Sequence, residues 1–261
     1  MIKKIFKILM WFVLLGASLF LLSFVNSKYD QIILKKISVD FNADYKHDFI
    51  TKNEVKEQLS DIGLQIDKSL KKEIDLNRIE NIFLNHPGVK KAEVFFVNNG
   101  HLKIEIEKRV PVGRVVSSFI DKNYYIDDSG DIMPLFMSNP AKVPVFTGAI
   151  KHASFQKNSN SDTNMYYQPI DVLFAMSKLI NNDSFLKSQI LQIHINNYGY
   201  FELIPRIGNQ RILFGNAENM EEKFRKIKLF YADGPHPKEL NVYDTLNVMY
   251  SNQIICSKRN N

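Results

Sequence analysis

The sequence holds a single cysteine, Cys256, among its 261 residues. A disulfide within the chain needs two cysteines, so the sequence excludes one, and it excludes a cysteine-based metal site for the same reason. A strong excess of one charge is also missing away from the ends of the chain. Of 34 basic and 28 acidic residues, five basic ones lie at the ends: Lys3, Lys4, Lys7, Lys258 and Arg259. The remainder is close to neutral, which argues against the strongly basic face of a nucleic-acid-binding domain.

The common signatures of catalytic and metal sites are missing as well. There is no HExxH, no G-x-S-x-G and no glycine-rich phosphate loop, and the six histidines show no paired ligand spacing. The densest carboxylate group, at 127–131, is too short for an EF-hand calcium loop, and Ser138 stands where such a loop has its last glutamate. We interpret this group as a solvated hairpin turn and Cys256 as a half-buried strand thiol. The sequence thus predicts no catalytic residue, metal or cofactor.

The longest apolar run lies near the start of the chain. Residues 8–25 carry no charge, and as a helix they would be about 27 Å long, close to the roughly 30 Å hydrocarbon core of a bilayer. The lysines before the run predict a cytoplasmic tail at 1–7, with everything after the run on the far side of the membrane. A cleaved signal peptide is the alternative, but its apolar region is usually only about 7–15 residues long. We therefore expect an uncleaved single transmembrane helix at 8–25, followed by a tether at 26–34.

Residues 35–110 predict a small α+β domain. The alternating residues 37–41 indicate a strand, a capping box at Thr51 opens a helix, and a second helix starts at Asp75. Two further alternating strands flank Asn99-Gly100, which is the strongest short hairpin signal. The expected order is strand, helix, helix, strand, strand (βααββ), with both helices on one face of a three-stranded sheet.

Residues 111–257 predict a second, mostly antiparallel β domain with two helices. Short apolar stretches typical of strands are separated by turn-forming Asn, Asp, Gly and Pro residues. Apolar residues recur at helical spacing near 170–180 and 218–231. A last extended segment is expected at 240–256, with a short tail at 258–261. The fold class expected for the whole chain is therefore α+β.

Several motifs, in this order, carry a resemblance to a known family. The βααββ region ends in HPGVKKAEV and LKIEIEKRVPVGRV, and YYIDDSGDIMPL, VPVFTG, FRKIKLFY and LNVMYSNQIICSK follow. Together with the apolar run, they resemble the bacterial cell-division family FtsQ/DivIB over nearly the whole chain. The resemblance implies that 35–110 is a POTRA domain. Two departures are a first strand without the usual glycine and a cytoplasmic tail of only a few residues.

What the resemblance implies for function is a non-enzymatic scaffold of the divisome at the division septum. Such a scaffold sits in the inner (cytoplasmic) membrane and binds the single-pass proteins FtsB/DivIC and FtsL. It helps to control septal peptidoglycan synthesis, and its POTRA domain is implicated in contact with FtsW and FtsI. No nucleic acid or small-molecule substrate is expected.

The resemblance also places partner contacts near the end of the β domain. The predicted partner-binding residues are Tyr243, Thr245, Asn247, Met249, Tyr250, Ser251, Gln253 and Ile255. The residues themselves agree in part, because an exposed terminal strand offers backbone groups to which a partner can add a strand. Thr245, Asn247 and Ser251 are suited to the water-facing side, whereas a contact by Tyr250 rests on the resemblance alone. Judged from the residues alone, an ordinary edge strand without a partner remains the alternative.

Two other functions are open to a tethered POTRA-bearing chain. An envelope-assembly factor of the outer membrane would need a long C-terminal β-barrel, and the region after Arg114 lacks the array of roughly ten-residue strands that a barrel requires. A membrane-anchored extracytoplasmic enzyme would need a nucleophile and a base close together, which no motif suggests. The scaffold is therefore the leading prediction.

Overall fold

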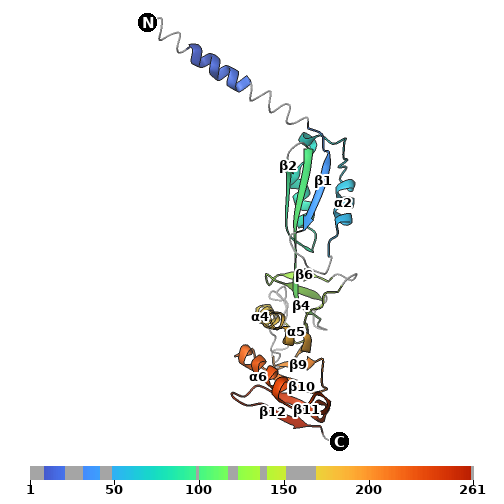
Figure 1. Ribbon diagram of the computed structural model, residues 1–261, viewed down its shortest axis with the longest axis vertical. Coiled ribbons are helices and arrows are strands. Elements are labelled where there is room, and N and C mark those ends of the chain that lie inside the picture. The colour runs from blue at the N-terminus through green and yellow to red at the C-terminus, as the bar shows by residue number, and fades with distance from the viewer. Residues whose placement is uncertain are drawn as a thin grey trace, which may run out of the picture. The chain divides into compact units, whose positions relative to one another are not determined.

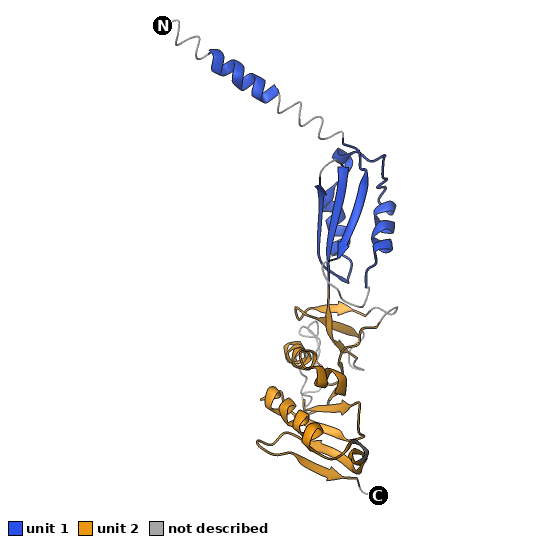
Figure 2. Cartoon of the chain, in the orientation of Figure 1, with its two compact units in different colours: residues 1–108 blue, residues 109–261 orange. Residues whose placement is uncertain are grey.

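The computed structural model describes residues 9–20, 32–41, 49–97, 100–116, 123–135, 140–150 and 169–259. The chain divides into two compact units, unit 1 at 1–108 and unit 2 at 109–261, and each is described by itself (Figure 2). A helix at 9–20 precedes the folded part of unit 1. Among the described residues, no helix has both the length and the apolar content of a membrane span. Residue 8 and residues 21–25 lie outside the described ranges, so the anchor at 8–25 stays a prediction.

Unit 1 has the predicted βααββ order. Its elements are β1 (Lys36–Phe41), α2 (Lys52–Asp61), the 3₁₀-helix η1 (Lys71–Glu73), α3 (Leu76–Leu84), β2 (Val89–Val97) and β3 (His101–Lys108). The sheet order is β1-β3-β2, with β1 parallel and β2 antiparallel to the central strand β3 (Figure 1). Both helices pack on one face of this sheet, where their apolar residues share one core with the strands. The prediction for this unit is confirmed.

Local capping explains why the two helices of unit 1 begin where they do. The Thr51 side chain accepts a hydrogen bond from the N–H of Glu54 at 3.2 Å, and Asp75 accepts one from the N–H of Arg78 at 3.0 Å. Each cap pairs one of the backbone N–H groups that the first helical turn leaves unsatisfied. At the β2–β3 turn, Gly100 has a φ of 79°, a conformation that glycine adopts without strain.

Unit 2 is built on one nine-stranded sheet of order β12-β11-β10-β9-β8-β7-β4-β5-β6. The strands are β4 (Pro111–Val115), β5 (Tyr124–Asp127), β6 (Ile132–Pro134), β7 (Val145–Gly148), β8 (Ile190–Ile195), β9 (Phe201–Pro205), β10 (Arg211–Gly215), β11 (Tyr243–Asn247) and β12 (Ile255–Lys258). Most neighbouring pairs are antiparallel, but β4–β7, β7–β8 and β10–β11 are parallel. Residues 151–166 are rich in polar residues, for which the sequence predicts a loop, and they lie outside the described residues.

In the part of unit 2 that the structure describes, three α-helices, rather than the two predicted, cover one face of this sheet. They are α4 (Ile170–Asn181), α5 (Ser184–Gln189) and α6 (Met220–Asp233). Their apolar residues share one core with a row of strand residues that runs across the sheet and includes Ile193, Leu203, Ile212 and Leu246. The missed helix, α5, has only six residues, too few for helical periodicity to show in the sequence.

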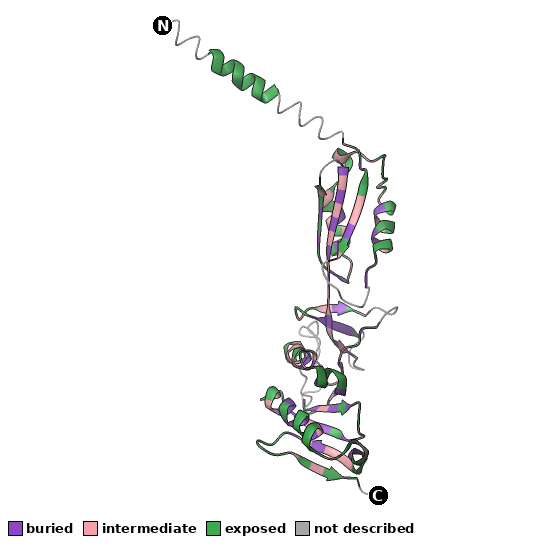
Figure 3. Ribbon diagram, viewed as in Figure 1, coloured by how far each residue is buried: buried purple, intermediate pink, exposed green. Residues whose placement is uncertain are grey.

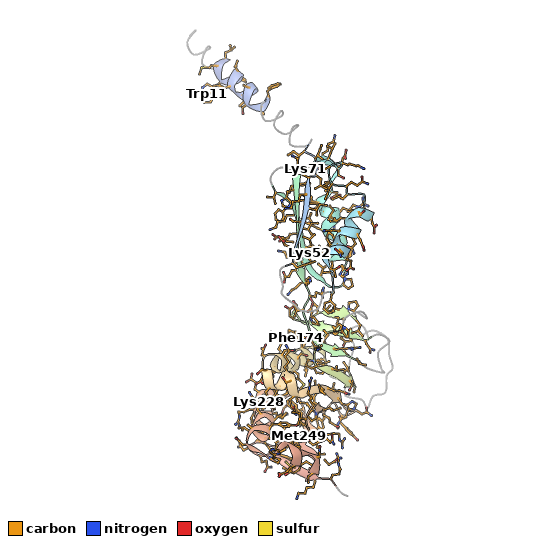
Figure 4. All side chains as sticks on the ribbon, turned by 45° about the vertical axis from the view of Figure 1, so that its right-hand side comes forward. Trp11, Lys52, Lys71, Phe174, Lys228 and Met249 are labelled. Carbon is orange, nitrogen blue, oxygen red and sulfur yellow. The ribbon has the colours of Figure 1, made fainter. Side chains whose placement is uncertain are left out.

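Asp183 links α5 to α6. Its side chain caps α5 by accepting a hydrogen bond from the N–H of Leu186 at 3.0 Å, and it accepts a second from Lys228 Nζ of α6 at 2.6 Å. Lys228 is labelled in Figure 4. These contacts, Lys228 first, hold the pKa of the Asp183 carboxyl below its ordinary value. A carboxyl group with a lowered folded-state pKa stabilises the fold above its unfolded pKa, and this contribution is lost as the pH falls through the folded pKa.

We therefore expect Asp183→Ala to lower the free energy of unfolding by about 1 kcal/mol at neutral pH, the usual cost of losing a helix cap. The difference in the free energy of unfolding between variant and parent should vanish in strong acid, because the Asp183 carboxyl of the parent is then protonated and has lost its charge. Urea unfolding of the full chain at a series of pH values measures both effects. Asp233→Ala at the exposed end of α6 is the control and should be neutral. A difference that stayed constant into strong acid would contradict the assignment.

Candidate partner-binding edge

The C-terminal segment forms two strands, so the prediction of one extended strand at 240–256 is wrong. The 3₁₀-helix η4 (Pro237–Val242) leads into β11, residues 248–254 form a connection, and β12 returns antiparallel to β11. Leu246 and Val248 are buried, as alternate residues of one strand would be, but this alternation does not continue to Tyr250, which is 48% exposed. Asn252 in the connection has a φ of 58°, a left-handed conformation that reverses the chain and that asparagine tolerates.

The second strand changes which strand forms the edge. β11 pairs with β10 on one side and with β12 on the other, so Thr245 and Asn247 lie within the sheet and not at its rim. In the described residues, β11 is the only strand that pairs with β12. The outer side of β12 is therefore the open edge at this end of unit 2.

The backbone groups that face outward from β12 follow from the strand register. Val248 donates its N–H to Leu213 O of β10, and because successive residues of a strand point their backbone groups to opposite sides, those of Thr245 and Asn247 point to β12. Their partners in register are Ser257 and Ile255. By the same alternation, the N–H and C=O groups of Cys256 and Lys258 point away from β11, toward the open edge of the sheet.

The predicted partner-binding residues fall into three groups around this edge. Tyr243, Thr245 and Asn247 lie on β11; Met249, Tyr250, Ser251 and Gln253 lie in the connection; Ile255 lies on β12. Ile255 stands opposite Asn247 on the sheet face that the helices leave uncovered, and its side chain is 43% exposed. Figure 3 colours most of β12 as exposed. The structure thus brings the eight residues into one region but gives the edge itself to residues 255–258.

Other edge strands in the described residues are less suited to strand addition. β6 at the opposite end of the nine-stranded sheet has three residues and ends in Pro134, which has no N–H to donate. In unit 1, the N–H of Val94 on the outer side of β2 donates to Glu80 Oε1 of α3 at 2.8 Å. A side-chain carboxylate thus occupies a position where an added strand would place a carbonyl. The outer edge of β1 is open too, but β1 belongs to unit 1, whereas the predicted partner-binding residues all lie in unit 2.

The predicted solvated turn at 127–131 is a turn, but its first residue is not solvated. Asp127 is 1% exposed. One carboxylate oxygen accepts the N–H groups of Ser129 and Asp131 at 3.0 and 2.9 Å, and the other accepts Arg109 Nη1 at 2.8 Å. The carboxylate therefore holds the β5–β6 turn and the first residue of unit 2 together. Cys256 is half-buried on β12, as predicted, and burial raises the pKa of its thiol.

Two buried lysines of α6 were not anticipated from the sequence. Lys223 and Lys226 are each 5% exposed. Lys223 Nζ donates to both oxygens of Asn216 at 2.9 Å, and burial, then the charge of Lys226, lowers its pKa. Lys226 Nζ donates to the connection before β12. The only sequence signal was helical spacing, which places both lysines beside the buried stripe containing Phe224 and Ile227.

The comparison with known families agrees with this architecture. Residues 33–107 match the model of a POTRA-like domain. Residues 110–257, more than half of the chain, match the model described as FtsQ/DivIB, C-terminal related. The chain belongs to the FtsQ/DivIB family. A search of curated proteins found no match.

Membership in the FtsQ/DivIB family gives the chain a scaffold role in bacterial cell division, at the division septum. The family match covers all of the nine-stranded sheet except Lys258, and so includes the connection and most of β12. The candidate edge therefore belongs to the part of the molecule that defines the family.

Proposed function

We propose that this FtsQ/DivIB-family chain is a non-enzymatic divisome scaffold, tethered in the cytoplasmic membrane, whose strand β12 pairs with a strand of an FtsB/DivIC-type protein. Together with that partner and FtsL, it helps to control septal peptidoglycan synthesis, and its POTRA-like unit contacts FtsW and FtsI. The observation that carries the proposal is the open outer edge of β12 in the unit that matches the family.

Strand addition at β12 follows from the chemistry of an open edge. The outward N–H and C=O groups of Cys256 and Lys258 supply main-chain hydrogen bonds to an added strand, and side chains near the edge supply selectivity. Met249 and Tyr250, which are 38% and 48% exposed, lie in the connection that leads into β12. We assign partner contact to the eight predicted residues of β11, the connection and β12, with the edge bonds made by the backbone of 256–258.

The helix at 9–20 supports the tether. All of its described residues are exposed (Figure 3), including Trp11 at 69% and Phe12 at 71%. A contiguous apolar surface on a folded protein marks contact with a membrane or another protein. In the proposed arrangement, residues 8–25 cross the membrane, the tail at 1–7 is cytoplasmic, and the POTRA domain at 35–110 and the β domain at 111–257 are extracytoplasmic.

The sharpest test is Cys256→Pro. Proline removes one outward N–H without removing a bond to β11, and proline is tolerated on an edge strand whose N–H faces solvent. We expect the dissociation constant for the cognate FtsB/DivIC-type protein to rise about tenfold or more, because one hydrogen bond is lost and the ring obstructs the added strand. Titration of the full-length chain in detergent micelles measures it.

Cys256→Ala is the matched control, because it removes the same thiol and keeps the N–H. Its dissociation constant should stay within about threefold of the parent value, a difference below 1.4 kcal/mol. Circular dichroism establishes that both variants remain folded. If the folded proline variant bound as tightly as the parent, the partner would dock away from β12.

A further inference from the structure

Lys226 of α6 is bound to the connection that leads into the edge strand. Its Nζ donates to Val248 O at 2.7 Å and to Tyr250 O at 2.6 Å. The side chain is 6% exposed, so its stem lies in the core while its ammonium group reaches the connection. One buried cation thus holds two backbone carbonyls that β11 and β12 leave outside their ladder.

The placement of this charge is specific. A buried ammonium group is unfavourable unless its donors are paired, and here two of its three N–H groups point at carbonyls. The nearest carboxylate oxygen to Lys226 in the described residues is Glu222 Oε1 at 3.8 Å, which is beyond hydrogen-bonding distance. The two carbonyls are therefore the groups that account for the position of Lys226.

Two further contacts restrain the same connection. Met249 donates its N–H to Asn247 Oδ1 at 3.0 Å. The Met249 side chain packs against Gly215 at the end of β10, where an added Cβ would lie 2.8 Å from Met249 Cγ and Sδ. These contacts act at the start of the connection, whereas Lys226 reaches to Tyr250, beyond the last residue bonded to β10. Among the described residues, Lys226 is thus the tie between α6 and the middle of the connection.

We propose that Lys226 is a positioning residue for partner binding: by holding the carbonyls of Val248 and Tyr250, it fixes the connection at 248–254 and so presents β12 in the position that an added strand requires. The inference rests on the proposed function, because it assigns Lys226 to the same docking edge. Its physical basis is preorganisation, since a connection that is already ordered need not be ordered when the partner binds.

The test compares Lys226→Met with the parent in the full-length chain. Methionine fills the space of the lysine stem and lacks the donors, so the core should remain packed. Hydrogen exchange should speed up in peptides covering 248–258 and stay unchanged in those covering β8 to β10. The dissociation constant for the cognate FtsB/DivIC-type protein should rise about tenfold, the size of effect expected when a few residues must be ordered on binding.

Two variants separate positioning from a general loss of structure. Lys226→Arg keeps N–H donors at the end of a long stem and should recover most of the exchange protection and of the affinity. Lys228→Met removes a lysine of the same helix whose side chain is 44% exposed and bonded to Asp183, so both readouts at the edge should match the parent.

The outcomes are distinguishable from failure of the proposed function. If the parent chain did not bind the cognate FtsB/DivIC-type protein, the proposed function would fail. The hydrogen-exchange comparison needs no partner, so it would still decide whether Lys226 orders the connection. Unchanged exchange at 248–258 in Lys226→Met would overturn the inference. Faster exchange with unchanged affinity would overturn it too, because an ordered connection would then be irrelevant to binding.

Discussion

Replacing Ile104 by aspartate is expected to unfold unit 1. Ile104 lies at the centre of β3, pairs with Val39 of β1 and Val94 of β2, and is fully buried against α2 and α3. The substitution removes a core side chain, which costs about 2–5 kcal/mol. It also places a carboxylate among the apolar side chains of this core, a further cost of several kcal/mol. The sum is comparable to the roughly 5–15 kcal/mol that holds an ordinary domain together.

Two variants of the same sheet control for the position and for the charge. Ile104→Val keeps the site apolar and should cost only about 0.5–1.5 kcal/mol. Val97→Asp adds the same carboxylate at the end of β2, where the side chain is 41% exposed, and should cost no more than about 1 kcal/mol. Circular dichroism and hydrogen exchange of the full chain report the outcome for each unit. An Ile104→Asp protein that melted with the parent would mean that Ile104 faces water.

Unit 1 was predictable because its signals are local and agree with one another. The caps at Thr51 and Asp75, the alternation along β2 and β3 and the positive φ of Gly100 all depend on residues within a few positions of each other. Local propensity and hydrophobic pattern then specify the same fold. The βααββ order could accordingly be derived without knowing any contact between distant residues.

The C-terminal hairpin was not predictable in the same way. Residues 243–248 alternate as a strand does, and no Asn-Gly or Gly-rich pair marks the reversal that follows. The chain turns where Asn252 takes a left-handed conformation and where Lys226, 22 residues before Val248, binds the backbone. Because that contact joins distant parts of the sequence, periodicity gave no sign of it. The sequence pattern therefore favours β11 as the edge strand, whereas the structure has β12 there.

Burial of charge explains the other difference between sequence and structure. Acidic residues in a turn are usually solvated, so the sequence predicts that Asp127 is as exposed as its neighbours. Arg109, whose guanidinium pairs with the buried carboxylate, stands 18 positions earlier in the sequence, before β4. Three donors converge on one carboxylate, and only the fold brings them together.

Asp127→Ala is therefore expected to destabilise unit 2 strongly. The substitution leaves the guanidinium of Arg109, whose side chain is 25% exposed, without this carboxylate, and it leaves the N–H groups of Ser129 and Asp131 without their acceptor. Breaking a buried ion pair by removing one partner costs about 3–5 kcal/mol. Urea unfolding of the full chain, with hydrogen exchange of β4 to β6, measures the loss and locates it.

The rank order of three variants shows which part of the carboxylate matters. Asp127→Asn keeps one oxygen that can accept the two turn N–H groups but removes the charge that faces Arg109, so it should cost about 1–3 kcal/mol, less than alanine. Asp131→Ala changes an exposed neighbour whose backbone makes the turn contacts, and it should be nearly neutral. Equal losses for asparagine and alanine would assign the stabilisation to the Arg109 pair alone. A neutral alanine variant would show that the turn at 127–131 is solvated after all, as its composition first suggested.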